Sequence, residues 1–375
     1  MTKLEDYAKD YKGETPVVML DIDQVEVNFN SMKRGMPKAN IHYAVKSNPN
    51  RYVLNRLHKL GCKFDAASVG EINLLFSIGV DPKNISFGNT IKKTKDIKYA
   101  YDNGITLFAV DSEEEIEKIA SVAPKSNVFV RMLIKTTEAE WPLSRKFGCS
   151  PNHVIGILDY AKKYNLNPIG ISFHVGSQTR HPSMWKDILH DIANIWTEAR
   201  TLGYPLNLLN IGGGFPSYYG TAITDLETYC AELQSTIDLN FEGVDYLMAE
   251  PGRGLVADAG IIVAEVVLVS KKHPSDEIRW VYLDIGKFSG LSETMEEAIK
   301  YQFIIPNTNT VETSKCILAG PTCDSADVLY EKNKVDLPID LKSGDKFIIK
   351  NTGAYTTTYS AVWFNGFDPL KEIIL

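Results

Sequence analysis

The sequence predicts an α/β protein in which a (β/α)8 barrel is joined to a second, mostly β domain. Its 375 residues exceed what one hydrophobic core usually serves. Between residues 41 and 250, short β-branched or aromatic runs alternate with amphipathic stretches of helical length. After about Gly260 the helical period fades, and strand-like runs separated by Gly, Pro, Asn and Asp follow. We therefore expect the barrel at residues 24–258 and the β domain at residues 1–23 and 259–375.

Eight short runs are the expected barrel strands, with helices between them. The strands are 41–45, 63–67, 85–88, 106–110, 128–134, 170–175, 206–211 and 246–250. The clearest helices are 69–78, 112–122, 151–164, 182–202 and 225–239. Ser112 followed by Glu115 has the spacing of a capping box. Eight such units suit a closed barrel better than an open sheet.

The β domain is expected to contain four strands after the barrel, at 261–269, 278–286, 314–320 and 345–351. The N-terminal run VVMLDID, at 17–23, is predicted to be a further strand that completes this domain. The two ends of the chain would then share one sheet.

Composition argues against several classes of protein. A net charge of -7 opposes binding to nucleic acid. The local basic run Lys83, Lys92, Lys93, Lys95 and Lys98 is interpreted as a solvated helix face and its loop. Charges scattered through the first residues and the lack of a long apolar run predict a cytoplasmic protein without a membrane segment. Five cysteines without a CxxC pair argue against a disulfide framework and a zinc site, so no metal is expected.

Ionisable residues and glycines gather where the expected strands end, which is where barrels carry their chemistry. Lys46 follows the first strand, and a partly desolvated lysine can serve as a Schiff-base amine. The run IGGGFP at 211–216 lets backbone N–H groups approach a phosphate, although it lacks the GxGxxG spacing of dinucleotide sites. EPGRG at 250–254 adds an arginine and a carboxylate. Together these features indicate a phosphorylated, ring-containing cofactor.

Seven motifs in order carry a family resemblance: YAVKSNP at 43–49, FDAASVGEI at 64–72, SFHVGSQ at 172–178, IGGGFP, EPGRG, GPTCDSAD at 320–327, and GAYT followed by FNGF within 353–367. With them the chain resembles the pyridoxal-phosphate (PLP) dependent decarboxylases of the alanine-racemase-like fold, group IV. That family includes ornithine, lysine, arginine and diaminopimelate decarboxylases. The motifs span nearly the whole chain, and their joint occurrence is specific. The resemblance implies PLP as the cofactor.

The resemblance also implies roles for individual residues. Lys46 would bind PLP covalently, Glu250 would pair with the pyridinium nitrogen, and His174 would stack on the ring. Cys323 would return the proton after carbon dioxide leaves, which completes the expected catalytic set. The remaining cofactor-binding residues would be Asp65, Arg131, Ser177, Gly213, Gly214, Gly252, Arg253 and Tyr355, with Glu71 joining Asp65 and Arg131 beneath the lysine. Family members place the cysteine motif in the partner's site, so a homodimer with shared active sites is implied.

The segment GLSETMEEAIKY at 290–301 bears on the substrate. Diaminopimelate decarboxylases carry an arginine there for the distal carboxylate, and Glu296 falls at its position in an ungapped alignment. A carboxylate attracts an ammonium group, so Asp324 with Glu296, or with Glu293 in a shifted register, should bind a terminal amine. Tyr355 and Phe364 are expected to line the same site. The choice among Glu293, Glu296 and Glu297 stays open.

The predicted reaction is decarboxylation of L-ornithine to putrescine, a step of polyamine biosynthesis. L-lysine decarboxylation, or activity on both amino acids, is the alternative. A diaminopimelate decarboxylase is less favoured because of Asp324 and Glu296, and a racemase on the same barrel because the Cys323 motif and FNGF resemble decarboxylases. A catalytically inactive regulatory homologue is less favoured because Lys46, His174 and Cys323 are all present.

Overall fold

The computed structural model describes residues 2–134, 146–306 and 308–375 and divides into two compact units. The barrel unit comprises Val25–Pro216 and Ile223–Leu255, and the β unit comprises Met1–Gln24, Ser217–Ala222 and Val256–Leu375. Within the described ranges, no helix combines the length and apolarity needed to cross a membrane.

Eight parallel strands close into the barrel in chain order, with the first strand pairing with the last. They are β2 (Ala39–Ala44), β3 (Lys63–Ala66), β4 (Ile85–Phe87), β5 (Leu107–Val110), β6 (Asn127–Arg131), β7 (Asn167–Ser172), β8 (Leu208–Asn210) and β9 (Tyr246–Ala249). The predicted (β/α)8 barrel is therefore confirmed. Phe129 of β6 packs with Ala109 and Leu208 in one apolar cluster of this unit.

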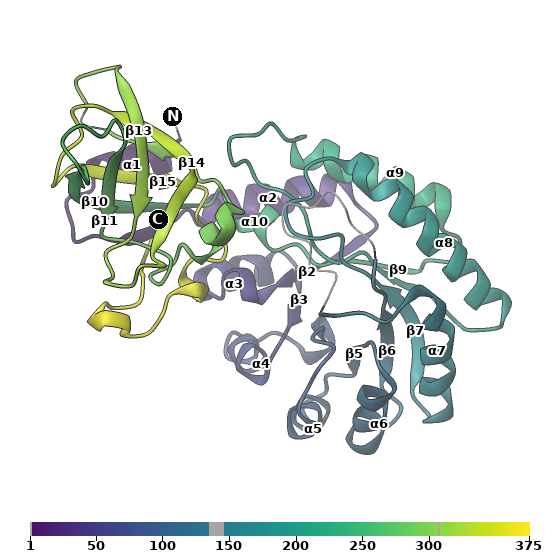
Figure 1. Ribbon diagram of the computed structural model, residues 1–375. Coiled ribbons are helices and arrows are strands. Elements are labelled where there is room, and N and C mark those ends of the chain that lie inside the picture. The colour runs from purple at the N-terminus through teal and green to yellow at the C-terminus, as the bar shows by residue number, and fades with distance from the viewer. Residues whose placement is uncertain (1, 135–145, 307) are drawn as a thin grey trace. The chain divides into compact units, whose positions relative to one another are not determined.

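Helices lie outside the strands, as Figure 1 shows for α4 to α9. They are α2 (Ile22–Gly35), α3 (Arg51–Lys59), α4 (Val69–Phe76), α5 (Thr94–Asp102), α6 (Glu113–Val122), α7 (Val154–Lys163), α8 (Lys186–Thr201), α9 (Leu226–Asn240) and the short α10 (Arg253–Val256). Local chemistry sets several starts, since Ser68 and Asp225 accept hydrogen bonds from Glu71 N and Thr228 N. Ser112 likewise caps α6 by accepting from Glu115 N at 3.3 Å.

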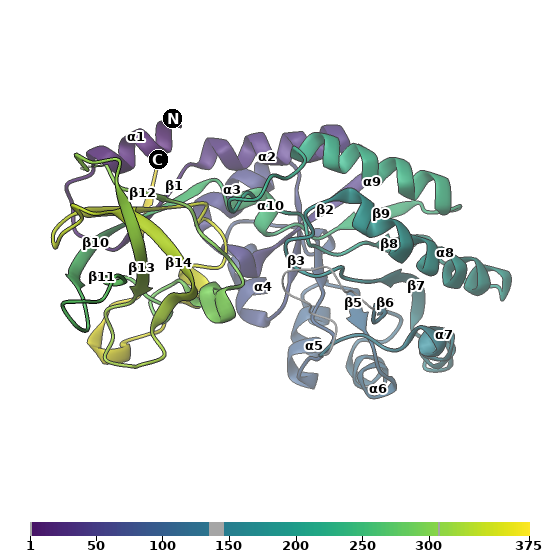
Figure 2. The same ribbon diagram turned by 45° about the horizontal axis from the view of Figure 1, so that its top comes forward.

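The β unit is one sheet of eight strands and a short helix, α1 (Lys3–Asp10). Figure 2 shows its long strands β13 and β14 beside each other. The strands are β1 (Val17–Leu20), β10 (Gly260–Ser270), β11 (Arg279–Leu283), β12 (Phe303–Ile304), β13 (Thr313–Ala319), β14 (Val328–Pro338), β15 (Lys346–Lys350) and β16 (Lys371–Ile374). Strand β1 pairs antiparallel with β10 and parallel with β16, so both chain ends belong to this sheet. Leu4, Val17, Met19, Ile261 and Ile348 form part of its core.

The predicted N-terminal strand is too long by three residues. Strand β1 ends at Leu20, and α2 begins at Ile22. Asp21 explains the change, because its carboxylate accepts from the N–H groups of Asp23 and Gln24 at the start of that helix.

Candidate active site

Lys46 lies in a 3-10 turn, Val45–Ser47, directly after β2. It is exposed, whereas its neighbours Val45 and Ser47 are buried. The turn is fixed from within: Ser47 Oγ donates to Ala44 O at 2.9 Å, and the Tyr43 hydroxyl donates to Asn48 O at 2.9 Å. A rigid turn therefore carries an accessible lysine at the carboxyl end of the barrel strands.

A cluster of charges from separate strands surrounds this lysine. Asp65 in β3, Arg131 at the end of β6 and Glu250 just after β9 interact electrostatically with one another, and Lys46 acts on both carboxyl groups. Burial raises the pKa of Asp65, against the lowering influence of Lys46. Glu71 in α4 belongs to the same cluster, and burial raises its pKa to about 6. The structure therefore brings together the predicted network residues and Lys46.

Glu250 is tied to the glycine loop through Asn210, a residue that the sequence analysis missed. Asn210 Nδ2 donates to Glu250 Oε1 at 2.6 Å, and Asn210 Oδ1 accepts from Gly212 N at 2.8 Å. Burial and the nearby Asp65 charge raise the pKa of Glu250 to about 7. No local pattern marks this bridge, although Asn210 stands one residue before the motif IGGGFP.

His174 follows β7 as a neutral imidazole with an assignable tautomer. Burial, with Arg131 and Lys46 nearby, lowers its pKa to about 3. Its Nδ1 accepts from Gly176 N at 2.9 Å, so the ring proton resides on Nε2. A neutral ring can lie beside these cations without charge repulsion.

Three of the predicted phosphate-binding residues, Ser177, Gly214 and Arg253, also lie in the barrel unit. Arg253, only 4% exposed at the start of α10 beside Gly252, donates through Nη2 to Ser177 Oγ at 3.2 Å. Gly214 has φ +106, and a Cβ there would lie 2.5 Å from Gly176 O. A Cβ on Gly213 would approach Glu250 O to 2.7 Å. Only glycine suits both positions, so backbone alone lines this side of the site, as a phosphate cradle requires.

The other predicted residues belong to the β unit. Cys323 and Asp324 are exposed in the loop after β13, and Tyr355 has φ +55. The Phe364 ring packs against Phe288 at a tilt of 40°, with ring centroids 4.6 Å apart. The predicted site residues thus fall into two sets, one in each unit.

Asn365, the residue after Phe364, holds the cysteine. Its Oδ1 accepts from Cys323 N at 3.0 Å and from Cys323 Sγ at 3.3 Å. Asn365 belongs to the FNGF motif, but the sequence alone does not reveal this contact.

The three candidate glutamates differ in their surroundings. Glu297 accepts from Glu331 N, Lys332 N and Asn333 N through its two carboxylate oxygens, so it serves to anchor β14. Glu293 is buried, whereas Glu296 is exposed with φ +53. Glu297 is therefore the least suited to bind a ligand.

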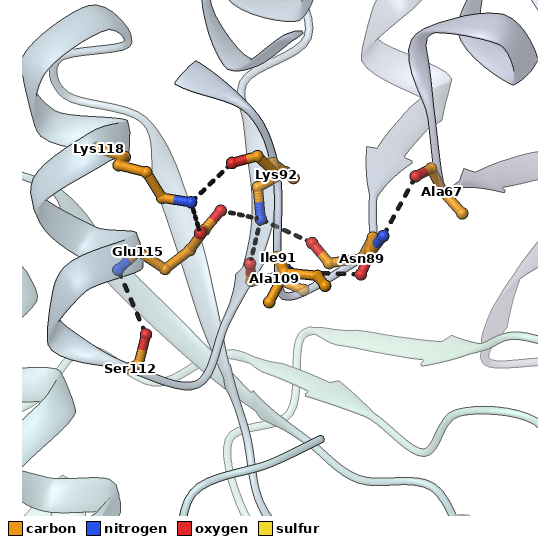
Figure 3. Close-up of polar contacts among 8 residues, drawn as sticks. All are labelled: Ala67, Asn89, Ile91, Lys92, Ala109, Ser112, Glu115 and Lys118. Atoms are coloured by element: carbon orange, nitrogen blue, oxygen red, sulfur yellow. Dashed lines mark hydrogen bonds and ion pairs between the residues drawn. The ribbon is translucent and has the colours of Figure 1, made fainter. Parts of the chain in front are cut away.

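The interpretation of the basic run as a solvated face is wrong for Lys92. Figure 3 shows this side chain pointing toward Glu115 of α6 and toward Asn89 and Ala109, and the residue is buried. Its Nζ lies 2.9 Å from Glu115 Oε1 and donates to the carbonyls of Asn89 and Ala109 at 2.7 Å each. Glu115 also pairs with Lys118, so it does not return the second bond of the predicted capping box. Burial lowers the pKa of Lys92 to about 8, but these contacts engage it fully.

Comparison with known proteins gives consistent matches over the whole chain. The sequence model described as "Pyridoxal-dependent decarboxylase, pyridoxal binding domain" matches residues 22–257. A lysine/ornithine decarboxylase of Selenomonas ruminantium is 32% identical over 361 residues, which cover 96% of this chain and 89% of that protein.

Two solved structures are similar in fold as well. The lysine/ornithine decarboxylase of Vibrio vulnificus, complexed with cadaverine, has a TM-score of 0.87 and 33% identity, covering 99% of this chain and 97% of that chain. The arginine decarboxylase of Paramecium bursaria Chlorella virus, bound to agmatine, has a TM-score of 0.89 and 27% identity, covering 99% of each chain.

Proposed function

The chain belongs to the pyridoxal-dependent decarboxylases, and from that premise we propose that it decarboxylates a basic L-amino acid, ornithine first and lysine second. It is a carboxy-lyase that uses pyridoxal 5'-phosphate. Beyond this, we propose the substrate, the roles of single residues and a homodimer.

The residues of the barrel unit fit the cofactor. The exposed Lys46 would bind its aldehyde, and the glycine loop with Ser177 and Arg253 would bind its phosphate. When bound, PLP supplies an electron-accepting ring that delocalises the charge left by departing carbon dioxide. Glu250 would face the ring nitrogen, and a cation there would hold the Glu250 carboxyl ionised. His174, being neutral, would cover the ring face without adding charge.

Cys323 is the proposed proton donor. Its Sγ donates to Asn365 Oδ1 at 3.3 Å, which holds the thiol in place. For proton return to the carbon that lost carbon dioxide, this thiol would have to leave its contact with Asn365.

We propose that a second copy of the chain covers the cysteine loop. Cys323 is exposed, and so are the large apolar side chains Val362 at 75% and Trp363 at 66% in the segment that carries Asn365. Contiguous exposed apolar side chains beside functional residues are typical of an interaction surface. The family resemblance of the cysteine motif favours a homodimer in which each cysteine serves the partner's barrel.

The observation that carries the basic-substrate proposal is a pair of exposed carboxylates, Asp324 and Glu296, both in the β unit. Asp324 Oδ1 accepts from Ala326 N at 2.8 Å, which orders its loop. Two carboxylates suit an ammonium group and repel the distal carboxylate of diaminopimelate. The lysine/ornithine decarboxylases among the similar proteins are consistent with this preference.

Product analysis tests the proposal. The purified protein with PLP is incubated separately with ornithine, lysine, arginine and diaminopimelate, and the amine formed is identified. We expect putrescine from ornithine, with a higher kcat/KM than cadaverine formation from lysine. Release of an amine from neither ornithine nor lysine would contradict it.

Glu296→Gln should lower kcat/KM for ornithine roughly 10-fold to 100-fold, the range expected for losing a charged hydrogen-bond partner. Glu331→Gln, also exposed in the β unit, is the matched control. Equal kinetics for the two variants would remove Glu296 from the substrate site.

A further inference from the structure

A line of polar side chains runs through the interior of the barrel unit to Asp65. Lys63 Nζ lies 2.6 Å from the Tyr246 hydroxyl, which lies 2.9 Å from His42 Nε2. His42 Nδ1 is 3.3 Å from Ser86 Oγ, and Ser86 Oγ is 3.4 Å from Asp65 Oδ1. The line starts where β3 and β9 begin and ends beside the cluster around Lys46. His42 is 1% and Ser86 0% exposed, so water does not separate the links.

Donor chemistry gives this line a direction. The ammonium group of Lys63 only donates, so the Tyr246 oxygen accepts from it. Across the described ranges, the other hydrogen-bond contact of that hydroxyl is with His42, so its proton is directed to Nε2. Burial and the charge of Lys63 lower the pKa of His42 to about 3, which leaves the ring neutral with its one proton on Nδ1.

The direction continues to the carboxyl group. Since His42 Nδ1 donates to Ser86 Oγ, the serine proton is directed onward to Asp65 Oδ1 or to Phe64 O, each at 3.4 Å. Phe64 O is thus a competing acceptor, and the backbone of Phe64 also contacts His42. The bond from Ser86 to Asp65 Oδ1 is the one that extends the line, and it lowers the pKa of that carboxyl group. A chain of aligned donors strengthens its last bond in a site of low dielectric constant.

The surroundings of Asp65 have opposite effects on its ionisation, so one further hydrogen bond affects the balance. Burial favours the neutral acid, and the carboxyl groups of Glu71 and Glu250 repel its charge. Lys46 and Arg131 favour the carboxylate. A Cβ on Gly88 would lie 1.9 Å from Asp65 Oδ1, so the carboxylate is packed directly on the backbone there.

We propose that the four side chains from Lys63 to Ser86 form a one-way hydrogen-bond chain that keeps Asp65 ionised beside Lys46. His42 and Tyr246 are then positioning residues that act through Ser86. The effect of an ionised Asp65 on catalysis rests on the proposed role of Lys46. The direction of the hydrogen bonds does not depend on that role.

Nitrogen NMR of the holoprotein labelled with ¹⁵N-histidine tests the direction, with His42→Gln assigning the signal. The expected result is a neutral ring with a protonated Nδ1 and a bare Nε2 throughout neutral pH. A proton on Nε2, or a doubly protonated ring, would overturn the proposal. The tautomer is read from the wild-type spectrum, and His42→Gln is needed only to assign the signal. If that variant does not fold, the shift caused by Ser86→Ala, which retains His42, assigns it.

Two variants separate the links. Tyr246→Phe removes the donor to Nε2 and should let the other tautomer of His42 appear. Ser86→Ala should leave the tautomer unchanged but remove the donor to Asp65. Both should lower the pH at which the visible band of the Lys46-bound cofactor titrates, by roughly 0.5–1 unit, because a weaker anion stabilises the lysine-borne cation less.

Tyr204→Phe is the matched control. The Tyr204 hydroxyl lies in the same unit, but it donates a hydrogen bond to Asp159, which is not part of the line from Lys63 to Asp65. It should change neither the His42 tautomer nor the pH at which the cofactor band titrates. Titration midpoints equal to wild type in both Tyr246→Phe and Ser86→Ala would overturn the effect of the hydrogen-bond chain on Lys46. Failure to release an amine from any basic amino acid would overturn only the proposed function, because the tautomer is measured independently of turnover.

Discussion

The protonation of Glu250 is set by its burial and by the neighbouring charges of the site. Burial and the charge of Asp65 raise its pKa to about 7 in the folded, cofactor-free protein, above its ordinary value of 4.5. The folded state therefore binds the proton more tightly than the unfolded state. The resulting stability is fully present below about pH 4.5 and is lost as the pH rises through about 7.

Glu250→Gln removes this dependence. Between pH 5 and pH 8 the Tm of the cofactor-free wild type should fall relative to that of the variant, by roughly 2–4 °C for each kcal/mol of linked free energy. Glu242→Gln, at an exposed glutamate of the same unit, should run parallel to wild type in calorimetry. Parallel curves for Glu250→Gln as well would mean that Glu250 is ionised in the fold at neutral pH.

Some residues of the site can be predicted from the sequence, and others cannot. Lys46, Asp65 and Glu250 could be selected because strand ends of a barrel converge, and the structure groups them electrostatically. Asn210 and Asn365 could not, because an amide that bridges two neighbours has no spacing that distinguishes it from a surface amide. Both are recognised only from the contacts they make.

At the level of elements, periodicity predicted the barrel strands to within a few residues, because buried parallel strands are short apolar runs. Strand β14 (Val328–Pro338) was not predicted. Its outer residues, such as Glu331 and Lys332, are exposed at the edge of the sheet, so the apolar pattern is weak. The N–H groups of these two residues bond to Glu297, which no local pattern reveals.

The Lys92–Glu115–Lys118 cluster joins the loop after β4 to helix α6 (Figure 3). Its charge pattern resembled a solvated face, but the side chain of Lys92 is 0% and that of Glu115 3% exposed. Removing one member of a buried ion pair leaves an uncompensated charge, which typically costs about 3–5 kcal/mol.

We therefore expect Glu115→Gln to lower the free energy of unfolding by about that amount in urea titration. Glu114→Gln, at the exposed neighbour in the same first turn of α6, should change it by less than about 0.5 kcal/mol. Similar losses for the two variants would mean that Glu115 contributes only as a charge near the helix N-terminus.

For the molecule as a whole, the predicted site residues are divided between two units, with Lys46 in the barrel unit and Cys323 in the β unit. If a homodimer shares its sites, Lys46→Ala and Cys323→Ala should each be nearly inactive alone. After subunit exchange, about half of the dimers are mixed, and each mixed dimer has one intact site. Activity should then recover toward roughly 25% of wild type. A mixture that stays inactive, with exchange verified by mass spectrometry, would place both residues in one chain.

Lys46 is proposed to bind the cofactor. Lys92 is an alternative in the same unit, because its lowered pKa of about 8 also suits a Schiff-base amine. Its contacts with Glu115 and two carbonyls argue against it, whereas Lys46 is exposed at the strand ends.

Borohydride reduction of the PLP-loaded protein, followed by peptide mass spectrometry, distinguishes the two lysines. We expect the reduced cofactor on the peptide that contains Lys46, its loss in Lys46→Ala, and its retention in the exposed control Lys83→Ala. Reduced cofactor on Lys92, or on any other lysine, would show that Lys46 does not carry it.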